Sequence, residues 1–431
     1  MPAAKPTGAS VRAYDVGFGD CFLLTFNYAS GDRHILIDFG STRLPSGKSG
    51  KGPYMERIAR QIAADCGNKL TAVVATHRHK DHISGFAKDG AKGSGAIIAG
   101  LQPEIVLQPW TENPKAAPND REAPKALRGA RLQARLHLQS LRNMNLYAES
   151  VREFAKTLGG KHLKGVRDQL EFLGDDNGLA NRSAVVNLMT MGKRKPKYLS
   201  AHAPSGLESL LPGVKVHVLG PPTLVQDARI STQTAENQDE FWHARARFWA
   251  RQARATAAEA KPLFPRHVVK NHSWDARWFI YYARQEHAGS MLSIVRCLDD
   301  AMNNTSLILL FEFGGKCLLF PGDAQWENWR YALSQKKVVD LLKRVTLYKV
   351  GHHGSLNATP KSLWKEFDHK GGANKAGRLL SVLSTKEKVH GSEAAHTEVP
   401  RRDLVDELKA KSTLSDTRST GTQAVSLIVK A

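Results

Sequence analysis

The sequence predicts an α/β fold, because strand-like and helix-like patterns alternate along it and side chains able to bind metal follow the strand-like runs. One such run, residues 70–75, leads directly into residues 76–82, which read Thr-His-Arg-His-Lys-Asp-His. A second run, residues 345–350, leads into Gly-His-His-Gly-Ser. Because α/β proteins place their sites at the carboxyl ends of strands, we expect both clusters to contribute to one site.

The first 110 residues are expected to form several strands and one helix. Residues 11–28 read as strand, glycine turn and strand, with the glycines supplying the backbone freedom that the turn needs. Residues 34–40 read as a strand that ends in an acid and a glycine. Residues 54–66 have apolar side chains at helical spacing, and the glycine that follows suits a helix end. Residues 104–110 predict the next strand.

The last third of the chain repeats this pattern. Its strand-like runs are short and apolar, and its helix-like runs carry apolar residues every three to four positions. The predicted strands are 213–219, 306–313, 316–320, 345–350, 379–384 and 424–429, and the predicted helices are 326–343 and a helix that begins at 402–408.

Two basic segments interrupt the α/β pattern. Residues 111–212 are polar, with basic side chains at helical spacing in 121–135 and a compact basic run at 193–197. Residues 223–300 interleave arginines with aromatic residues, most densely in 241–251. Such stretches form solvated or packed helix faces, and they also suit nucleic acid. We expect one domain over residues 1–431, with 111–212 and 223–300 as mainly helical insertions.

Composition narrows the class of partner. The chain has 62 lysines and arginines against 41 acids, a net charge of +21 that favours nucleic acid or other phosphate-bearing substrates. The alternative is that this charge only keeps the protein in solution. Its four cysteines form no Cys-x-x-Cys pair, so neither a thiolate zinc ribbon nor a disulfide framework is expected. With no signal-like segment and no apolar run of about 20 residues, we expect a cytoplasmic protein without a membrane segment.

The stretch from His77 to His82 has the donors of a metal site. His77 and His79 alternate, so a chain leaving a strand can direct both imidazoles to the same side. Asp81 and His82 follow and can serve a second position. These donors suit a pair of ions such as Zn²⁺, whereas the alternative is a surface turn that happens to be rich in histidine.

Further groups are candidates to complete this site. Asp323 follows a strand-like run directly behind Gly322, where a bridging carboxylate could lie. Asp38 ends an earlier strand-like run and can orient a neighbouring group. Histidines also follow the later strand-like runs, and these are His352, His353, His390 and His396.

Together these motifs resemble the metallo-β-lactamase fold hydrolases, in particular the hydrolase domain of ComEC-like competence proteins and their stand-alone relatives. The resemblance covers about residues 11–110, 213–222 and 303–431 and implies an αββα sandwich. The motifs that carry it are Asp15-Val16-Gly17-x-Gly19-Asp20, Ile37-Asp38-x-Gly40, Thr76-His77-x-His79-x-Asp81-His82, Asn303-x-x-Ser306-Leu307, Gly322-Asp323-Ala324 and Val350-Gly351-His352-His353-Gly354-Ser355.

The resemblance also implies roles for these residues. The implied ligands are His77 and His79 for the first ion, Asp81 and His82 for the second, Asp323 as the bridge, and His396 as the last ligand of the second ion, with His390 as the other candidate. Asp38 is the implied supporting acid. His352 and His353 are implied to contact a substrate phosphate or donate a proton, or one of them to bind metal directly. Asn303 and Ser306 stand where the fold usually supplies a further histidine, so the first ion is expected to be the looser one.

Our hypothesis is a metal-dependent hydrolase, a phosphodiesterase or nuclease that acts on DNA or RNA. Two divalent ions, Zn²⁺ or Mn²⁺, would activate water, with Asp81, His352 and His353 as the catalytic residues. One alternative is hydrolysis of a small phosphodiester, a phosphorylcholine-type ester or a lactone. Another is a non-catalytic, metal-stabilised protein that binds a partner in a multi-protein system.

Overall fold

The computed structural model describes residues 5–113, 151–158, 164–176, 182–227, 230, 288–289, 291–292, 299, 301–355, 359–389, 398–419 and 424–430. The chain divides into two compact units. The first unit comprises Met1–Leu132, Asn181–Ser231 and Met302–Ala431, and the second comprises Gln133–Ala180 and Thr232–Ala301. The basic run at 121–135 and the aromatic stretch at 241–251 lie outside the described residues.

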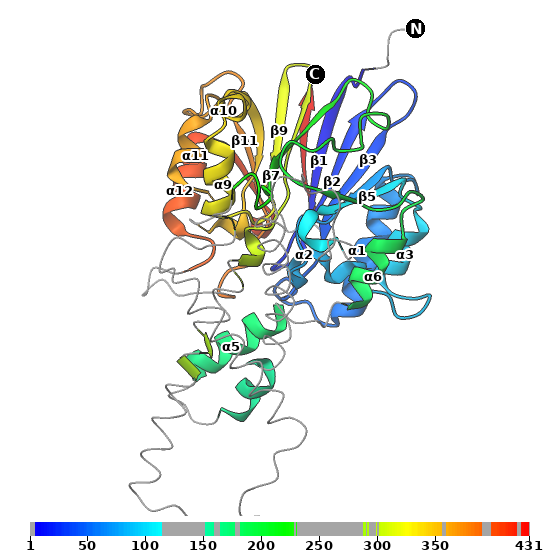
Figure 1. Ribbon diagram of the computed structural model, residues 1–431, viewed down its shortest axis with the longest axis vertical. Helices are drawn as coiled ribbons and strands as arrows, with labels where there is room; N and C mark the ends of the chain where they lie inside the picture. Colours follow the sequence, from blue (N-terminus) through cyan, green and yellow to red (C-terminus); the bar gives the residue numbers. More distant parts are fainter. Residues whose placement is uncertain are drawn as a thin grey trace, which may run out of the picture. The chain divides into compact units, whose positions relative to one another are not determined.

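The first unit contains two mixed β-sheets, so the predicted α/β class is confirmed (Figure 1). One sheet has seven strands in the order β13-β1-β2-β3-β4-β5-β6. Its pairs are antiparallel from β13 to β3 and parallel from β3 to β6. The strands are β1 (Gly8–Tyr14), β2 (Cys21–Asn27), β3 (Arg33–Phe39), β4 (Ala72–Val74), β5 (Ile105–Pro109), β6 (Lys197–Leu199) and β13 (Ala424–Lys430).

The other sheet has six strands in the order β12-β11-β10-β9-β8-β7. Its pairs are parallel from β12 to β9 and antiparallel from β9 to β7. The strands are β7 (Lys215–Gly220), β8 (Ile308–Phe313), β9 (Lys316–Phe320), β10 (Val345–Lys349), β11 (Leu380–Leu383) and β12 (Thr413–Asp416).

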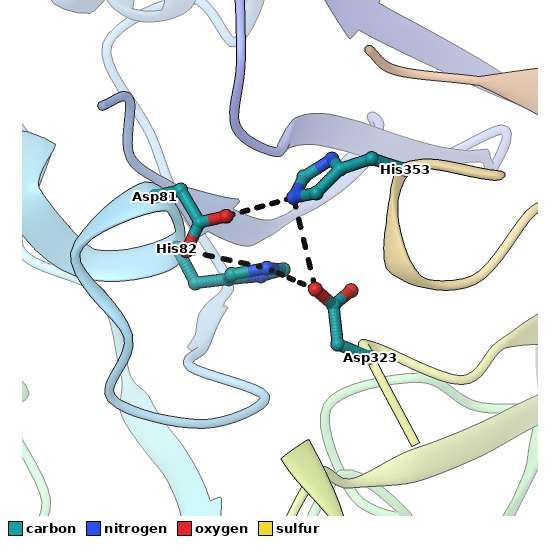
Figure 2. A group of neighbouring side chains, drawn as sticks. All are labelled: Asp81, His82, Asp323 and His353. Carbon is teal, nitrogen blue, oxygen red and sulfur yellow. Dashed lines mark hydrogen bonds and ion pairs between the residues drawn. The ribbon is translucent and has the colours of Figure 1, made fainter. Parts of the chain in front are cut away.

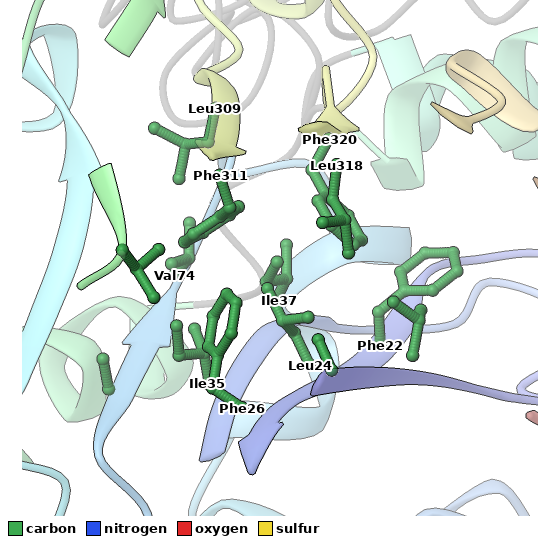
Figure 3. Packing of buried hydrophobic residues seen from close by; sticks show 14 of the residues in the cluster. Phe22, Leu24, Phe26, Ile35, Ile37, Val74, Leu309, Phe311, Leu318 and Phe320 are labelled. Atoms are coloured by element: carbon green, nitrogen blue, oxygen red, sulfur yellow. The ribbon is translucent and has the colours of Figure 1, made fainter. Parts of the chain in front are cut away.

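A central core of apolar side chains joins the two sheets (Figure 3). Alternate residues of a strand point to opposite faces, so Phe22 and Leu24 of β2 enter this core while Leu23 packs on the outer side. Phe311 of β8 and Phe320 of β9 enter it from the other sheet. Because both faces of these strands are buried, the sequence shows continuous apolar runs there rather than polar alternation.

Helices cover the outer face of each sheet (Figure 1). On the seven-stranded sheet these are α1 (Lys51–Asp65), α3 (Ser94–Gly100) and α6 (Arg182–Thr190). On the six-stranded sheet they are α9 (Trp326–Leu333), α10 (Lys336–Lys343), α11 (Lys361–Glu366) and α12 (Arg402–Lys411). Within the described residues, no helix is both long enough and apolar enough to span a membrane.

Several elements differ from the predicted ones. The single helix predicted over 326–343 is two helices, because Gln335 is extended and redirects the chain so that Val338 and Leu342 are buried. The predicted first insertion supplies helices α5 (Lys164–Asp176) and α6, but it also supplies strand β6, which pairs parallel to β5. That strand has three residues and follows a basic run, so its sequence shows no strand alternation.

Candidate metal centre

The candidate site lies where strands of both sheets end. Asp38 is the penultimate residue of β3, and residues 76–82 follow β4. On the other sheet, Asp323 follows β9, and His352 and His353 follow β10. The predicted clusters therefore meet, because parallel neighbours in each sheet end at the same edge.

A short helix, α2 (Lys80–Ile83), carries Asp81 and His82 into the site. Its backbone is held by the turn between β1 and β2, because Asp20 donates its backbone N–H to the Asp81 carbonyl oxygen at 3.0 Å. Gly40 lies directly against this helix: a Cβ added there would be 2.3 Å from the Asp81 carbonyl carbon. A glycine at this position therefore lets the two loops approach closely.

Four buried residues converge at the centre of the site: Asp81, His82, Asp323 and His353 (Figure 2). One ligand atom from each lies within 4.8 Å of the others. His82 Nε2 is 2.9 Å from Asp323 Oδ2, and His353 Nε2 is 2.8 Å from Asp81 Oδ2. Two carboxylates and two imidazoles are a donor set that suits a divalent transition ion. We call these four residues the four-residue set.

The far nitrogens of both histidines are held by groups outside the set. His353 Nδ1 donates to the carbonyl oxygen of Ser384 at 3.1 Å, so Nε2 is the nitrogen that faces the set and, once deprotonated, can offer its lone pair to an ion. His82 Nδ1 lies 2.9 Å from Asp38 Oδ2, which gives the same tautomer. Metal-binding histidines are commonly held in this way, and Asp38 is the group that holds the His82 ring.

The unpaired atoms of the four-residue set also suit a bound cation. Asp81 Oδ1 is buried and accepts no hydrogen bond from the residues that the structure describes. Both imidazole Nε2 atoms face carboxylate oxygens, so either a proton or a metal ion has to lie between each lone pair and its neighbouring carboxylate. The residues present therefore fit a divalent ion.

These contacts shift the pKa values of the set strongly. Burial alone would lower the pKa of His82, but the carboxylates of Asp323 and Asp81 raise it well above its ordinary value. Burial would raise the pKa of Asp323, but His82 and Lys349 lower it well below the usual range. The metal-free set is thus a group of imidazoliums and carboxylates in which protons occupy the places of a cation.

Metal-free protein should lose stability as pH rises. Burial would lower the pKa of His353, but Asp323 and Asp81 raise it to about 9, so the proton bound in the folded state stabilises it fully only below about pH 6.5. Chelator-treated protein should lose on the order of 3 kcal/mol between about pH 6.5 and 9 in urea titrations.

Saturating Zn²⁺ should remove that loss, because metal binding replaces the proton. The variant His353→Gln is the control, since it lacks the titrating group and should lose this part of the pH dependence. The same pH dependence with and without Zn²⁺ would contradict the assignment of His353 to the set.

His77 and His79 lie beside the four-residue set but contact each other. His77 Nε2 is 3.0 Å from His79 Nδ1, and His77 Nδ1 is 3.2 Å from Thr76 Oγ1. Thr76 Oγ1 donates to Asp38 Oδ2 at 2.7 Å, so the bonds form a chain in which His77 Nε2 accepts from His79. Among the described residues, this pair is not joined by a third His, Cys, Asp or Glu at ligand spacing.

The two histidines after β10 differ in surroundings. His353 is buried in the set, whereas His352 is partly exposed and donates its backbone N–H to Asp323 Oδ1 at 3.1 Å. Both have left-handed backbones, with φ of 40° for His352 and 51° for His353, and Asp38 has φ of 55°. Non-glycine residues adopt such backbones at a cost and cluster at functional sites, which supports a functional role for this edge.

Other predicted residues lie apart from the set or beyond the described residues. His390 and His396 lie outside the described residues. Ser306 and Asn303 are buried, and Ser306 Oγ accepts a hydrogen bond from the Asp323 backbone N–H at 3.2 Å. Ser306 therefore supports the loop that carries Asp323.

The sequence interpretation missed two charged residues at this site, Asp20 and Lys349. Asp20 belongs to the glycine turn between β1 and β2, but the acid that holds this turn is Asp15, which accepts the Gly17 N–H at 3.0 Å. Instead, Asp20 is fully buried and forms an ion pair with Lys349. The sequence feature that indicates a role for Lys349 is its position: it is a cation at the end of an apolar strand, three residues before His352.

No protein-family model matches the chain, and a search of curated proteins also finds no match. Function therefore has to be inferred from the chemistry of the site.

Proposed function

We propose that this protein is a metal-dependent hydrolase of phosphodiesters, with DNA or RNA as the substrate class, on a fold of the metallo-β-lactamase type. The observation that carries the proposal is the buried four-residue set, drawn from strand ends of two facing sheets. The layering of helices outside and sheets inside supports the fold, and the order of the motifs along the chain supports the family resemblance.

Asp81 and His352 are suited to different roles in hydrolysis. A divalent ion bound by the set would supply Lewis acidity and lower the pKa of a water molecule. Asp81 Oδ1, buried and without a hydrogen bond from the described residues, is suited to accept a hydrogen bond from that water and orient it. His352 is the more exposed histidine, so it is suited to contact a phosphate oxygen or protonate the leaving group.

Charge favours nucleic acid among phosphodiesters. The net charge of +21 attracts polyanions. In the first unit, the side chains of Lys193, Arg194 and Lys195 are exposed just before β6. These residues are suited to contact a phosphate backbone without reading its sequence.

The direct test is cleavage of plasmid DNA, single-stranded DNA and RNA by chelator-treated protein to which Mn²⁺ or Zn²⁺ is returned. We expect cleavage that depends on the returned ion, with nucleic-acid binding that weakens steeply as salt rises. Parallel assays use bis-p-nitrophenyl phosphate and a lactone. Hydrolysis of the small substrates alone would overturn the nucleic-acid assignment, and no hydrolysis of any substrate by metal-loaded protein would overturn the proposed activity.

A further inference from the structure

A cavity of about 930 Å³ lies at one edge of the six-stranded sheet. It is bounded by β7, which is the last strand of that sheet, by α10, and by the residues that follow β6. All of these segments belong to the first unit, and no residue of the four-residue set lines the cavity. Its size falls in the range of about 300–1,000 Å³ that ligand sites occupy. We call it the β7 cavity.

The backbone of β7 is open on the side away from β8. In an antiparallel pair, successive residues direct their backbone groups alternately toward the partner strand and away from it. Val218 directs its carbonyl oxygen away from β8, because that oxygen accepts the His202 N–H at 2.8 Å. Val216, two residues earlier, therefore directs its N–H and C=O outward as well. Among the described residues, no backbone group bonds to Val216 on that side.

The side chains of β7 show how the cavity meets this open edge. Val216 and Val218 pack toward the central core between the sheets, whereas Leu219 packs with α10 on the outer side. Val216 lines the cavity although its side chain points inward, so the cavity reaches its backbone. An extended segment in the cavity could therefore pair with Val216 and extend the sheet by one strand.

The other lining residues indicate which side chains such a segment would carry. Val338 and Leu341 of α10 are apolar, and Lys336 and Lys337, the first two residues of α10, are exposed. None of the described lining residues is acidic. Side chains two positions apart in an extended segment lie on the same face. An acidic residue two positions from an apolar one would therefore meet both kinds of lining.

This combination favours a peptide over other occupants. A second copy of the chain carries the same net charge of +21 and would be repelled. A nucleic acid would suit the lysines, but seven of the twelve lining residues are apolar. Neither a nucleic acid nor a small anion would pair with the backbone of an edge strand as a peptide does. An acidic extended peptide suits the lysines, the apolar residues and the open backbone together.

We propose that the β7 cavity binds an extended segment of a partner protein, which adds to the six-stranded sheet beside β7 and places an acidic side chain at Lys336 and Lys337. This inference goes beyond the proposed function, because it requires neither a bound metal ion nor hydrolysis. The cavity would connect the protein to an acidic partner, while the four-residue set acts separately.

The test begins with random nine-residue peptides displayed on phage and selected on the full-length protein, followed by fluorescence polarisation of the enriched peptides. These peptides should carry Asp or Glu two positions from an apolar residue. The double variant Lys336→Glu, Lys337→Glu should weaken their binding about tenfold or more. The matched control is Lys361→Glu, Lys365→Glu, which makes the same change at two exposed lysines of α11 that do not line the cavity and should leave binding unchanged.

Two further measurements test the backbone pairing. Val216→Pro removes the outward N–H, and a strand edge tolerates proline where that N–H does not bond within the sheet. This variant should weaken peptide binding about tenfold or more and leave hydrolysis of bis-p-nitrophenyl phosphate unchanged. N-methylation of the peptide at alternate residues should abolish binding for one set of residues and spare the other, whether or not any variant folds.

Peptide binding that neither N-methylation nor folded Val216→Pro weakens would overturn the added strand. A selection that enriches no peptide sensitive to these changes would overturn the proposal as well. An oligothymidine whose binding the double lysine variant weakens as strongly as that of the peptide would assign the cavity to nucleic acid instead. Each of these results leaves the metal centre standing, whereas absence of Zn²⁺ binding would overturn the metal centre and leave peptide binding intact.

Discussion

Replacing Asp323 with asparagine should remove tight binding of a divalent ion and reduce phosphodiester hydrolysis by about a thousandfold or more. Asp323 contributes one of the two carboxylates in the four-residue set, and its Oδ2 is the oxygen that both histidines face. An amide has nearly the same shape but lacks the negative charge. The loss should therefore come from electrostatics rather than from a cavity.

The fold should survive this change, because Lys349 keeps its ion pair with Asp20. Calorimetry with Zn²⁺ and hydrolysis of bis-p-nitrophenyl phosphate measure the two effects, and circular dichroism checks the fold. Asp340→Asn is the matched control: it makes the same chemical change at an exposed aspartate of α10. Tight Zn²⁺ binding by folded Asp323→Asn would contradict the ligand assignment.

Replacing Gly40 with alanine should destabilise the protein by about 3 kcal/mol or more and weaken divalent-ion binding. The added methyl group would meet three backbone atoms, the Asp81 carbonyl carbon at 2.3 Å, its oxygen at 2.4 Å and the His82 nitrogen at 2.4 Å. Backbone atoms cannot rotate away as a flexible side chain can. The start of α2 would have to move, and Asp81 and His82 would move with it.

Urea unfolding and Zn²⁺ calorimetry measure these two consequences. Gly100→Ala is the control, because a methyl group there would meet no atom within 4 Å and lies at the end of helix α3. Alanine is the better helix former, so this control should be neutral or slightly stabilising. Gly40→Ala with wild-type stability and wild-type Zn²⁺ affinity would show that the two loops are not as closely packed as described.

The sequence predicts this site well where a functional side chain follows an apolar strand. Asp38, Asp81, His82 and Asp323 are all visible in this way, because parallel strands bring their carboxyl ends to one edge. The same pattern identifies the two sheets, apart from short strands such as β6, which lack enough residues to show a period.

The sequence predicts poorly what depends on pairing between distant segments. Asp20 and Lys349 each resemble ordinary charged residues at the end of a strand, and only their ion pair explains their burial. His352 and His353 are neighbours in the chain and both have left-handed backbones, yet only His353 is buried, a difference that the sequence pattern does not reveal. Nor does the spacing of His77 and His79 reveal that the two rings bond to each other.

The position of the four-residue set between two sheets has a consequence for how the folded state is held together. Asp81 and His82 follow β4 of the seven-stranded sheet, whereas Asp323 and His353 follow β9 and β10 of the six-stranded sheet. His82 and Asp323 are separated by 241 positions in the chain. Closing so long a loop lowers the entropy of the chain, and local contacts alone do not offset this cost. The edge of the sheets that carries the four-residue set should therefore form late in folding. A ligand that recognises only the closed edge stabilises the whole unit by mass action. A divalent ion in the set would then act as a reversible cross-link between the sheets, in addition to any part in hydrolysis.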